Sequence, residues 1–248
     1  TNTFRGELMA KQKKTAVEEK VGEAVPRQAI LLEIENVAFK GRQLLYDVVK
    51  KVLGNRDMDL SVPVFCRYCV HAPAQQFVPS LLKLASKTRL SEERAVADIS
   101  SALKHALDGS VKVEPAFKDL IRIASERKVL IGGLSSMDKD VSVRILSELG
   151  LPDMGNSIFQ CTGEQGDPQK ANAWLQLAKS MSVMPSQCVT VTTSAAACKA
   201  TVAARMRSVV VSDKFTCFQD FGGANVVFDS LDKDAVEAIF DLLNPTIE

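Results

Sequence analysis

Residues 29–39 read AILLEIENVAF, a short apolar run that leads directly into two carboxylates, Glu33 and Glu35. The length and flanks of the run Ile30–Leu32 predict a buried β-strand, which places the two acids at its carboxyl end. In open sheets of parallel strands, ligands bind outside the carboxyl ends of the strands. The acids therefore have two interpretations: side chains held by water or hydrogen bonds at a strand end, or a site that binds a cation or performs chemistry.

Beyond this stretch, apolar runs and amphipathic segments alternate along the chain. Further strands are expected at 129–131, 157–160, 188–191, 208–211 and 225–228, and helices at 115–127, 140–149, 171–181, 195–205 and 233–243. A tight turn, or a nest of backbone N–H groups that binds an anion, is expected at Gly132-Gly133. Strands separated by helices of this length indicate βαβ units. The fold class expected is α/β: a Rossmann-like parallel sheet with helices on both faces, plus an inserted α-helical part.

Residues 44–111 interrupt this alternation, because they are rich in helix signals and poor in strand signals. Helices are expected at 43–53, closed by Gly54, at 79–86, and at 92–107 behind Ser91 as N-cap. The sequence therefore predicts a helical insert at 44–111 within an α/β core formed by 29–43 and 112–248. Residues 1–28 alternate Lys and Glu with few large apolar side chains, which predicts a charged, solvated tail.

The amino-acid composition argues against a nucleic-acid-binding protein and against a membrane protein. Hydrophobic residues make up 46% and charged residues 25% of the chain, as in soluble globular proteins. The net charge of +1 provides no long-range field for nucleic acid or an anionic membrane, and no apolar run approaches the ~20 residues of a membrane span. We therefore expect no nucleic-acid partner and no membrane insertion.

The six cysteines provide a further expectation. Several lie in apolar stretches, which indicates reduced thiols in the cytoplasm or in an equivalent reducing compartment such as an organelle stroma. Cys66, Cys69 and His71 have the residue types of half a zinc site. Because the chain has no second C-x-x-C and only His105 as another histidine, buried thiols are the favoured interpretation.

Three stretches carry a resemblance to a known family. They read AILLEIENV at 29–37, KVLIGGLSS at 128–136, and DPQKANAWLQLAKSMSVMPSQCVTVTTSAAACKATVAARMRSVVV at 167–211. Their order and spacing resemble the haloacid dehalogenase (HAD) superfamily, in particular its β-phosphoglucomutase-like members with a helical cap. The resemblance spans about residues 29–244 and implies that the helical insert is the cap.

The resemblance also implies where the first two catalytic motifs lie. Family members carry Asp-x-Asp at the end of the first strand, as nucleophile and acid/base, and the matching positions here are Glu33 and Glu35. Each carboxylate stands one methylene further out, and a displacement of about 1 Å can reduce such a reaction about 10²-fold. The second motif supplies a Ser or Thr hydroxyl at a strand end. Strand alignment matches it to Gly133, or to Ser135 if the loop is displaced by two residues.

The third and fourth motifs are matched in the long segment. The family's lysine corresponds to Lys170, or to Pro168 if the alignment is drawn from the following helix. The fourth motif carries acids that complete a magnesium site, and Thr192 and Thr193 stand in their place. Neutral hydroxyls are poor substitutes for carboxylates as ligands of this cation.

These substitutions lead to three hypotheses about function. The first is a catalytically degenerate HAD-like protein, a pseudoenzyme that acts as a structural, assembly or binding component with a protein partner or as an oligomer, without catalytic residues, metal or cofactor. The alternative is a magnesium-dependent phosphatase or phosphomutase, with Glu33 as nucleophile, Glu35 as acid/base, the metal held by these two, and Lys170 as phosphate clamp. The last is a phosphometabolite sensor without turnover that binds near Ser135, Lys170 and Ser194.

Overall fold

The computed structural model describes residues 27–87, 89–108, 111–135, 147, 157–161 and 167–244, the stretch 157–161 by its backbone only. Nearly all of the predicted tail 1–28 and of the predicted helix 140–149 lies outside these residues. No helix in the described part of the chain has the length and apolar character needed to cross a membrane.

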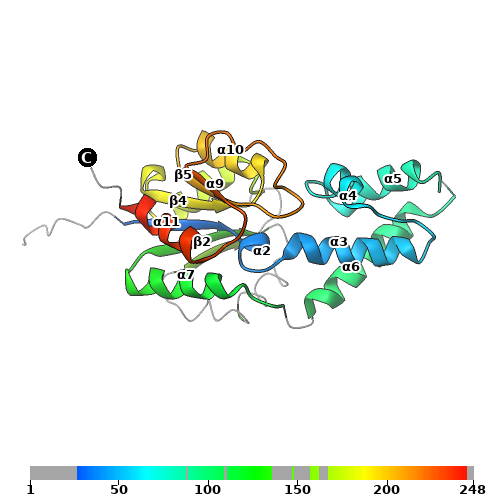
Figure 1. Ribbon diagram of the computed structural model, residues 1–248, viewed down its shortest axis with the longest axis horizontal. Coiled ribbons are helices and arrows are strands. Elements are labelled where there is room, and N and C mark those ends of the chain that lie inside the picture. The colour runs from blue at the N-terminus through cyan, green and yellow to red at the C-terminus, as the bar shows by residue number, and fades with distance from the viewer. Residues whose placement is uncertain are drawn as a thin grey trace, which may run out of the picture.

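Six parallel strands form one sheet in the order β3-β2-β1-β4-β5-β6 (Figure 1). Their bounds are β1 (Ala29–Glu33), β2 (Leu130–Ser135), β3 (Ser157–Cys161), β4 (Cys188–Thr192), β5 (Arg207–Val211) and β6 (Val226–Phe228). The chain adds β2 and β3 on one side of β1, then β4, β5 and β6 on the other. The strand order therefore reverses at β1, and a crevice opens there at the carboxyl ends. The predicted α/β class is confirmed.

Side chains of β1 alternate between the two faces of the sheet, as the period of a strand requires. Ile30 and Leu32 pack into the hydrophobic core on one face, and Ala29 and Leu31 into the core on the other. The helices that cover the two faces are α7 (Pro115–Glu126) and α11 (Lys233–Leu243) on the first, and α9 (Ala171–Ser180) and α10 (Ala195–Ala203) on the second. Because both faces are covered, β1 is apolar throughout until Glu33.

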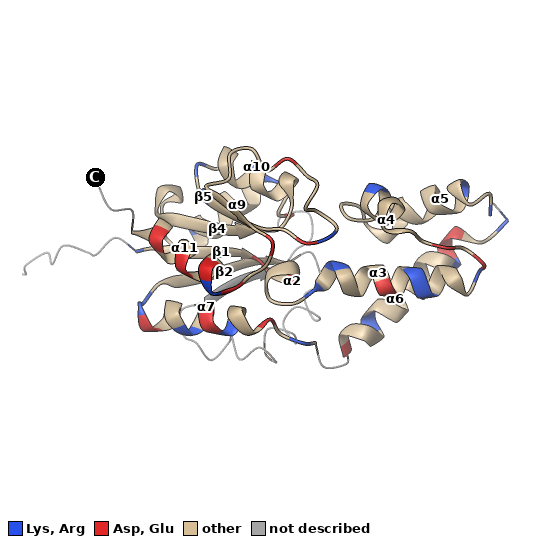
Figure 2. Ribbon diagram, in the orientation of Figure 1, with Lys and Arg blue, Asp and Glu red and all other residues tan. Residues whose placement is uncertain are grey.

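Four helices lie beside the carboxyl edge of the sheet (Figure 1). They follow the short helix α2 (Ile34–Val37) and are α3 (Gly41–Gly54), α4 (Val62–Tyr68), α5 (Ala74–Leu84) and α6 (Glu92–Asp108). We call residues 41–108 the helical unit. It has a hydrophobic core of its own, separate from those on the sheet. Basic and acidic residues are interspersed along α3 and α7, whereas the visible side of α11 is mainly acidic (Figure 2).

The prediction of a break at Gly132-Gly133 is wrong, because both glycines lie inside β2. A Cβ atom on Gly132 would lie 2.5 Å from Sδ of Met181 and 2.9 Å from a methyl carbon of Leu31. The glycine is thus explained by the close approach of the end of α9 to the sheet. Residues within a strand ladder do not form the predicted turn or anion nest.

One helix begins earlier than predicted, and another was not predicted. Helix α5 begins at Ala74 rather than Pro79, so that Pro79 lies inside it. The loss of one backbone hydrogen bond at this proline is tolerated in a helix that buries Phe77 and Leu81, because packing supplies most of the stability of a helix. Helix α4 was not predicted, since it buries only Phe65 and therefore lacks an amphipathic pattern.

One aromatic side chain of the α/β core completes the hydrophobic core of the helical unit. Phe215 follows β5 and is only 1% exposed. Its ring centroid lies 5.0 Å from that of Phe65 and 5.4 Å from that of Tyr46. The backbone N–H of Phe215 donates to Oδ1 of Asp213 at 2.8 Å, which fixes the turn that presents the ring. The helical unit is therefore packed directly against a loop of the core.

This packing predicts the effect of Phe215→Ala. Truncation of a buried phenylalanine removes about 3–5 kcal/mol from the free energy of unfolding, measured here by urea denaturation. Phe218→Ala is the matched control, because Phe218 lies in the same loop and is 65% exposed. Equal losses in the two variants would contradict the packing described.

Candidate functional site

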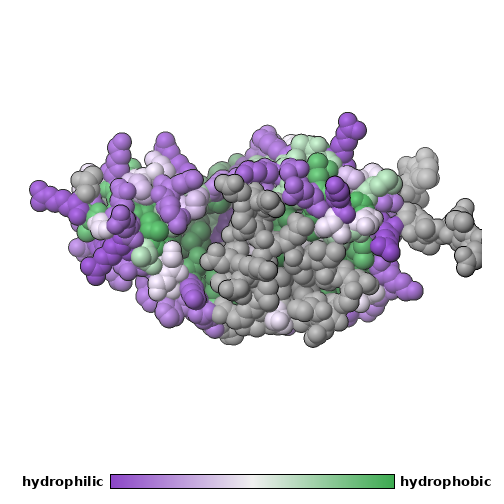
Figure 3. Space-filling model, turned by 180° about the vertical axis from the view of Figure 1, so that it is seen from behind, coloured by the Kyte–Doolittle hydropathy of each residue, from purple (hydrophilic) through white to green (hydrophobic). Residues whose placement is uncertain are grey.

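A cavity of about 200 Å³ lies between the carboxyl edge of the sheet and the helical unit. Figure 3, which views the molecule from behind, shows both hydrophobic and hydrophilic side chains around the hollow beside the helical unit. The cavity lies where the strand order reverses, as expected for a ligand site in an open α/β sheet. Its polar lining residues are Glu33, Glu35, Asn36, Arg42, His71, Asp167, Gln169 and Ser194.

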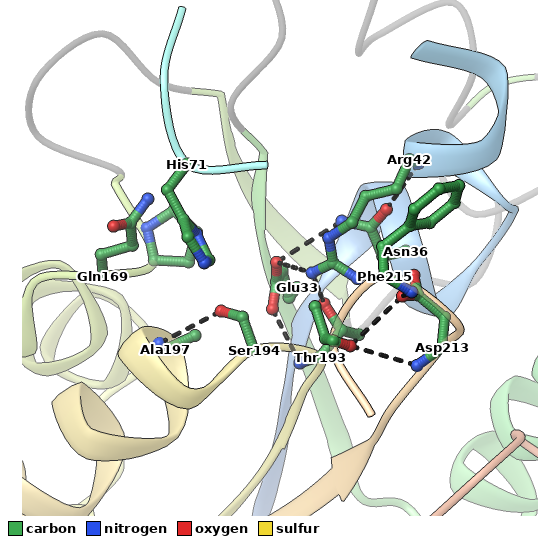
Figure 4. A network of polar contacts seen from close by, with 12 residues as sticks. Glu33, Asn36, Arg42, His71, Gln169, Thr193, Ser194, Ala197, Asp213 and Phe215 are labelled. Carbon is green, nitrogen blue, oxygen red and sulfur yellow. Dashed lines mark hydrogen bonds and ion pairs between the residues drawn. The ribbon is translucent and has the colours of Figure 1, made fainter. Parts of the chain in front are cut away.

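Glu33 is the last residue of β1, and its carboxylate points into this crevice (Figure 4). The residue is 6% exposed. Its Oε2 accepts a hydrogen bond from the backbone N–H of Thr193 at 2.9 Å, and its Oε1 lies 3.4 Å from Nη2 of Arg42. Both oxygens therefore have donors supplied by the protein itself.

Arg42 places a buried cation at the centre of the site (Figure 4). It lies in the first turn of α3, and its backbone N–H donates to Oδ1 of Asn36 at 2.9 Å. Besides the contact with Glu33, its Nη1 donates to Oδ2 of Asp213 at 2.7 Å and its Nη2 donates to Oγ1 of Thr193. A buried guanidinium is tolerated only where carboxylates and acceptors surround it, and here two carboxylates share one cation.

Glu35 lies in α2, where it is 8% exposed, and its Oε1 accepts a hydrogen bond from Oγ of Ser135 at 2.6 Å. Ser135 is the last residue of β2. The assignment of the second motif to Gly133 is wrong, because Gly133 lies inside the strand opposite Leu32. The hydroxyl expected at this strand end is therefore present, at Ser135.

The end of β4 provides hydroxyls in place of acids. Thr192 ends the strand, and its buried Oγ1 has no hydrogen-bond partner among the described residues. Thr193 contacts Glu33 and Arg42 as described above. Ser194 is the N-cap of α10 and accepts from the backbone N–H of Ala197 at 3.3 Å while it also lines the cavity.

Lys170, the predicted phosphate clamp, does not line the cavity formed by the described residues. It is the N-cap of α9, and its exposed side chain lies 3.8 Å from Oδ2 of Asp167. The preceding residues Asp167, Pro168 and Gln169 do line the cavity. The backbone carbonyl of Pro168 accepts a hydrogen bond from Nε1 of Trp174 at 2.8 Å, which anchors this segment to α9.

His71 is a second polar side chain, after Arg42, that the helical unit contributes to the described lining of the cavity (Figure 4). Its Nε2 lies 3.1 Å from Nε2 of Gln219. Burial lowers the pKa of His71 from its ordinary value, and the charge of Arg42 lowers it further, against the smaller opposite effects of Glu33 and Asp167. The imidazole is therefore neutral at neutral pH.

Of the two cysteines near His71, Cys69 is buried and Cys66 is half-buried. Burial raises the pKa of Cys69 to about 12 and also raises the pKa of Cys66. Within the part of the chain that the structure describes, no three His, Cys, Asp or Glu residues are grouped so that they could hold a metal ion. The arrangement thus offers no support for the zinc half-site.

The residues of this crevice do not fit magnesium. The cation prefers several carboxylate and water oxygens in an octahedral arrangement, but β4 ends in Thr192 and Thr193. The guanidinium of Arg42 contacts both Glu33 and Thr193, so a positive charge already stands between the ends of β1 and β4. A divalent ion placed there would be repelled by it.

Sequence analysis did not identify the ion pair of Arg42 and Asp213, nor Asp167 and Gln169 in the lining of the cavity. Arg42 and Asp213 are separated by 171 positions in the chain, although their side chains form an ion pair. Asp213 could have been found, because it follows β5 closely and the carboxyl ends of parallel strands share one edge. Arg42 had no such signal, since it lies in a helix with ordinary amphipathic spacing.

The structure is similar to solved structures of HAD-family hydrolases and β-phosphoglucomutase-like proteins. A HAD family hydrolase from Deinococcus radiodurans R1 with bound phosphate and sodium is 19% identical, with a TM-score of 0.69 over 89% of this chain and 99% of that chain. A β-phosphoglucomutase from Clostridium difficile is 19% identical, with a TM-score of 0.67 over 88% of this chain and 97% of that chain.

CbbY from Rhodobacter sphaeroides in complex with phosphate is 13% identical, with a TM-score of 0.67 over 85% of this chain and 99% of that chain. No family model matches the sequence, and no curated protein matches it. At these identities the likeness concerns the fold. It confirms the HAD-like fold that the resemblance of the three sequence stretches implied.

The ion pairs of Arg42 predict a large effect of Arg42→Met. The variant leaves Glu33 buried without its cation, and breaking a buried pair in this way lowers the free energy of unfolding by about 3–5 kcal/mol. Chemical denaturation measures the loss. Arg122→Met is the control, because the ion pairs of Arg122 are exposed on α7, and its denaturation midpoint is expected to stay unchanged. A stable Arg42→Met variant would show that the guanidinium is not needed there.

The lowered pKa of His71 predicts a pH dependence of stability. The unfolded chain takes up this proton near pH 6.5, whereas the folded protein takes it up only at lower pH, so stability is full above about pH 6.5 and decreases as the pH falls below it. His71→Gln should flatten this part of the stability profile between about pH 7 and 5. His105→Gln is the control, because His105 lies on α6 and is not among the residues that line the cavity; a flattening by both variants, or by neither, would contradict the assignment.

Proposed function

We propose that this chain is a HAD-fold protein that binds a ligand between its sheet and its helical unit and does not perform magnesium-dependent phosphoryl transfer. The observation that carries the proposal is the contact of the Arg42 guanidinium with Glu33 and Thr193. These are the positions at which the resemblance implies a nucleophile and a metal ligand. An arginine from the protein holds the place of the cation that the reaction requires.

The environment of Glu33 supports the same proposal. A carboxylate nucleophile attacks in line and depends on placement within a fraction of an ångström. Here Oε2 is held by a backbone N–H and Oε1 by a guanidinium. Both interactions stabilise the carboxylate in place and withdraw electron density from the oxygens that would attack. The crevice thus favours Glu33 as a structural anion.

A phosphatase or phosphomutase is the second candidate, and the similar structures favour it over a non-enzymatic role. One of the three structures is named a hydrolase and another a phosphomutase, and two of them, the hydrolase and CbbY, have phosphate bound. Ser135 also supports it, because its hydroxyl stands at the expected strand end. What this candidate lacks is an acid at the end of β4 and, among the described residues, a lysine that lines the cavity.

Two other functions have less support. A sensor of phosphorylated metabolites would need a positive cavity, but among the described lining residues there are three carboxylates, of Glu33, Glu35 and Asp167, and one guanidinium, of Arg42. A protein partner or oligomer remains a prediction of the sequence, as does the reducing compartment.

An assay of the purified chain against phosphate monoesters of graded size, with magnesium, tests the proposal. We expect phosphate release no faster than that of the Glu33→Gln variant. The unmodified chain and the Glu33→Gln variant should both first be shown to fold, by circular dichroism and a cooperative thermal melt. Magnesium-dependent turnover that Glu33→Gln abolishes would establish the second candidate and overturn the first.

A further inference from the structure

The helical unit and the loop after β5 each contribute a cysteine to the boundary at which they meet. Figure 1 shows this loop, in orange, beside α4, and the ring centroids of Phe65 in α4 and Phe215 in the loop lie 5.0 Å apart. Cys66 follows Phe65 directly, and Cys217 lies two residues after Phe215. The contact between the two aromatic rings therefore brings both cysteines to the same boundary.

The side chain of Cys66 faces the loop that carries Cys217. Cys66 packs against the core of the helical unit, to which Phe215 belongs. Burial raises the pKa of Cys66, and the negative charges of Asp213 and of the Cys217 thiolate raise it further. Salt screens charges at the surface beyond about 10 Å, so an effect of this kind requires that Cys66 and Cys217 lie near each other. Both are free thiols.

Both cysteines are held in place by backbone structure. The backbone N–H of Cys217 donates to the carbonyl oxygen of Asp213 at 2.8 Å, and the carboxylate of Asp213 is held by Arg42. Cys66 lies within α4. The contacts that attach the helical unit to the core therefore also keep the two thiols close to each other.

The two thiols differ in exposure. Cys217 is exposed, whereas Cys66 is half-buried. A disulfide in solution therefore reaches Cys217 first. Since the thiolate is the reactive form of a cysteine, burial and the raised pKa make Cys66 the slower of the two. An accessible thiol with a second thiol beside it is the arrangement found in cysteines that sense redox state.

We propose that Cys66 and Cys217 form a reversible disulfide that links the helical unit to the α/β core, with a low-molecular-weight disulfide as oxidant. The thiolate of Cys217 attacks one sulfur of the oxidant, breaks its S–S bond and releases one thiolate. The thiolate of Cys66 then attacks the sulfur of Cys217 in the mixed disulfide and releases the second. The two leaving groups take up the two protons that the cysteines lost, so two protein thiols are oxidised and one disulfide is reduced to two thiols.

This link acts on the cavity of the candidate site. Val70 and His71 follow α4 closely and line the cavity. The loop that carries Cys217 holds Arg42, another lining residue, through Asp213. A covalent bond across the boundary therefore fixes the wall of the cavity that the segment after α4 forms. The proposal concerns the position of the helical unit and does not depend on which ligand the cavity binds.

Mass spectrometry of the full chain tests the disulfide. The reduced protein is treated with excess oxidised glutathione at about pH 8, where thiolates form readily, and the remaining thiols are then blocked with N-ethylmaleimide under denaturing conditions. We expect a peptide pair that joins Cys66 to Cys217 and that dithiothreitol separates. The thermal midpoint of the oxidised protein should rise by at least about 5 °C, because a bridge that closes a long loop restricts the unfolded chain.

Three variants assign the roles of the two thiols. Cys217→Ser should form no disulfide and show no rise of the midpoint. Cys66→Ser should retain glutathione on Cys217, because the thiol that would release it is missing. Cys69→Ala is the control and should still form the bond, because Cys69 is buried three residues after Cys66 and is the neighbouring thiol that competes for it. The peptide pair of the unmodified chain decides the question even if a variant does not fold.

Three results would overturn the proposal: no disulfide after the treatment, a bridge from Cys66 to a cysteine other than Cys217, or glutathione that remains on Cys217 of the unmodified chain. None of these results bears on the proposed function, which the assay with phosphate monoesters tests separately.

Discussion

The guanidinium of Arg42 connects four segments that are distant in the sequence. It contacts the end of β1 through Glu33, the end of β4 through Thr193 and the loop after β5 through Asp213, and it belongs to the first turn of α3. A charge this deeply buried is stable only because carboxylates and a hydroxyl surround it. The start of the helical unit is thereby fixed to the edge of the sheet, beside the cavity that Glu33 and Arg42 line.

Hydrophobic contacts also attach the helical unit to the α/β core. Phe215 leaves the loop after β5 and enters the core of the helical unit between Tyr46 and Phe65. Asp213, two residues earlier, holds Arg42 and also accepts the backbone N–H of Phe215. One short loop therefore carries both the polar and the apolar contact between the two parts of the molecule. Their relative position is set by packing and charge together, so the cavity between them has a defined shape.

Much of this fold was predictable from local patterns, and the errors have identifiable physical causes. The run Ile30–Leu32 and the other short apolar runs predicted the parallel sheet, because strands covered on both faces need hydrocarbon at nearly every position. The rule for carboxyl ends placed Glu33 at the site. Sequence periodicity, however, cannot show that Met181 approaches Gly132, and so the glycines were interpreted as a turn.

The site was less predictable than the fold, because its chemistry depends on contacts between side chains that are far apart in the sequence, and not on the local pattern around each residue. The resemblance to HAD proteins implied that Thr192 and Thr193 stand where family members carry acids, but it gave no sign of the arginine that contacts Glu33. An ion pair that spans 171 residues leaves no trace in local spacing. Ser135 was considered only as a second choice, because this strand was expected to end at Ile131, four residues before the end of β2.

The absence of a side chain at Gly132 bears on the position of α9, and through α9 on the residues that it brings to the cavity. Met181 adjoins the carboxyl end of α9, and the segment before the amino end of the same helix carries Asp167 and Gln169 into the cavity. A helix is stiff along its length and protein interiors are densely packed. A shift of α9 at its contact with Gly132 would therefore also move the other end of the helix. An added methyl group at Gly132 would press on the flexible ends of Met181 and Leu31, and if α9 moved with Met181, the segment with Asp167 and Gln169 would move as well.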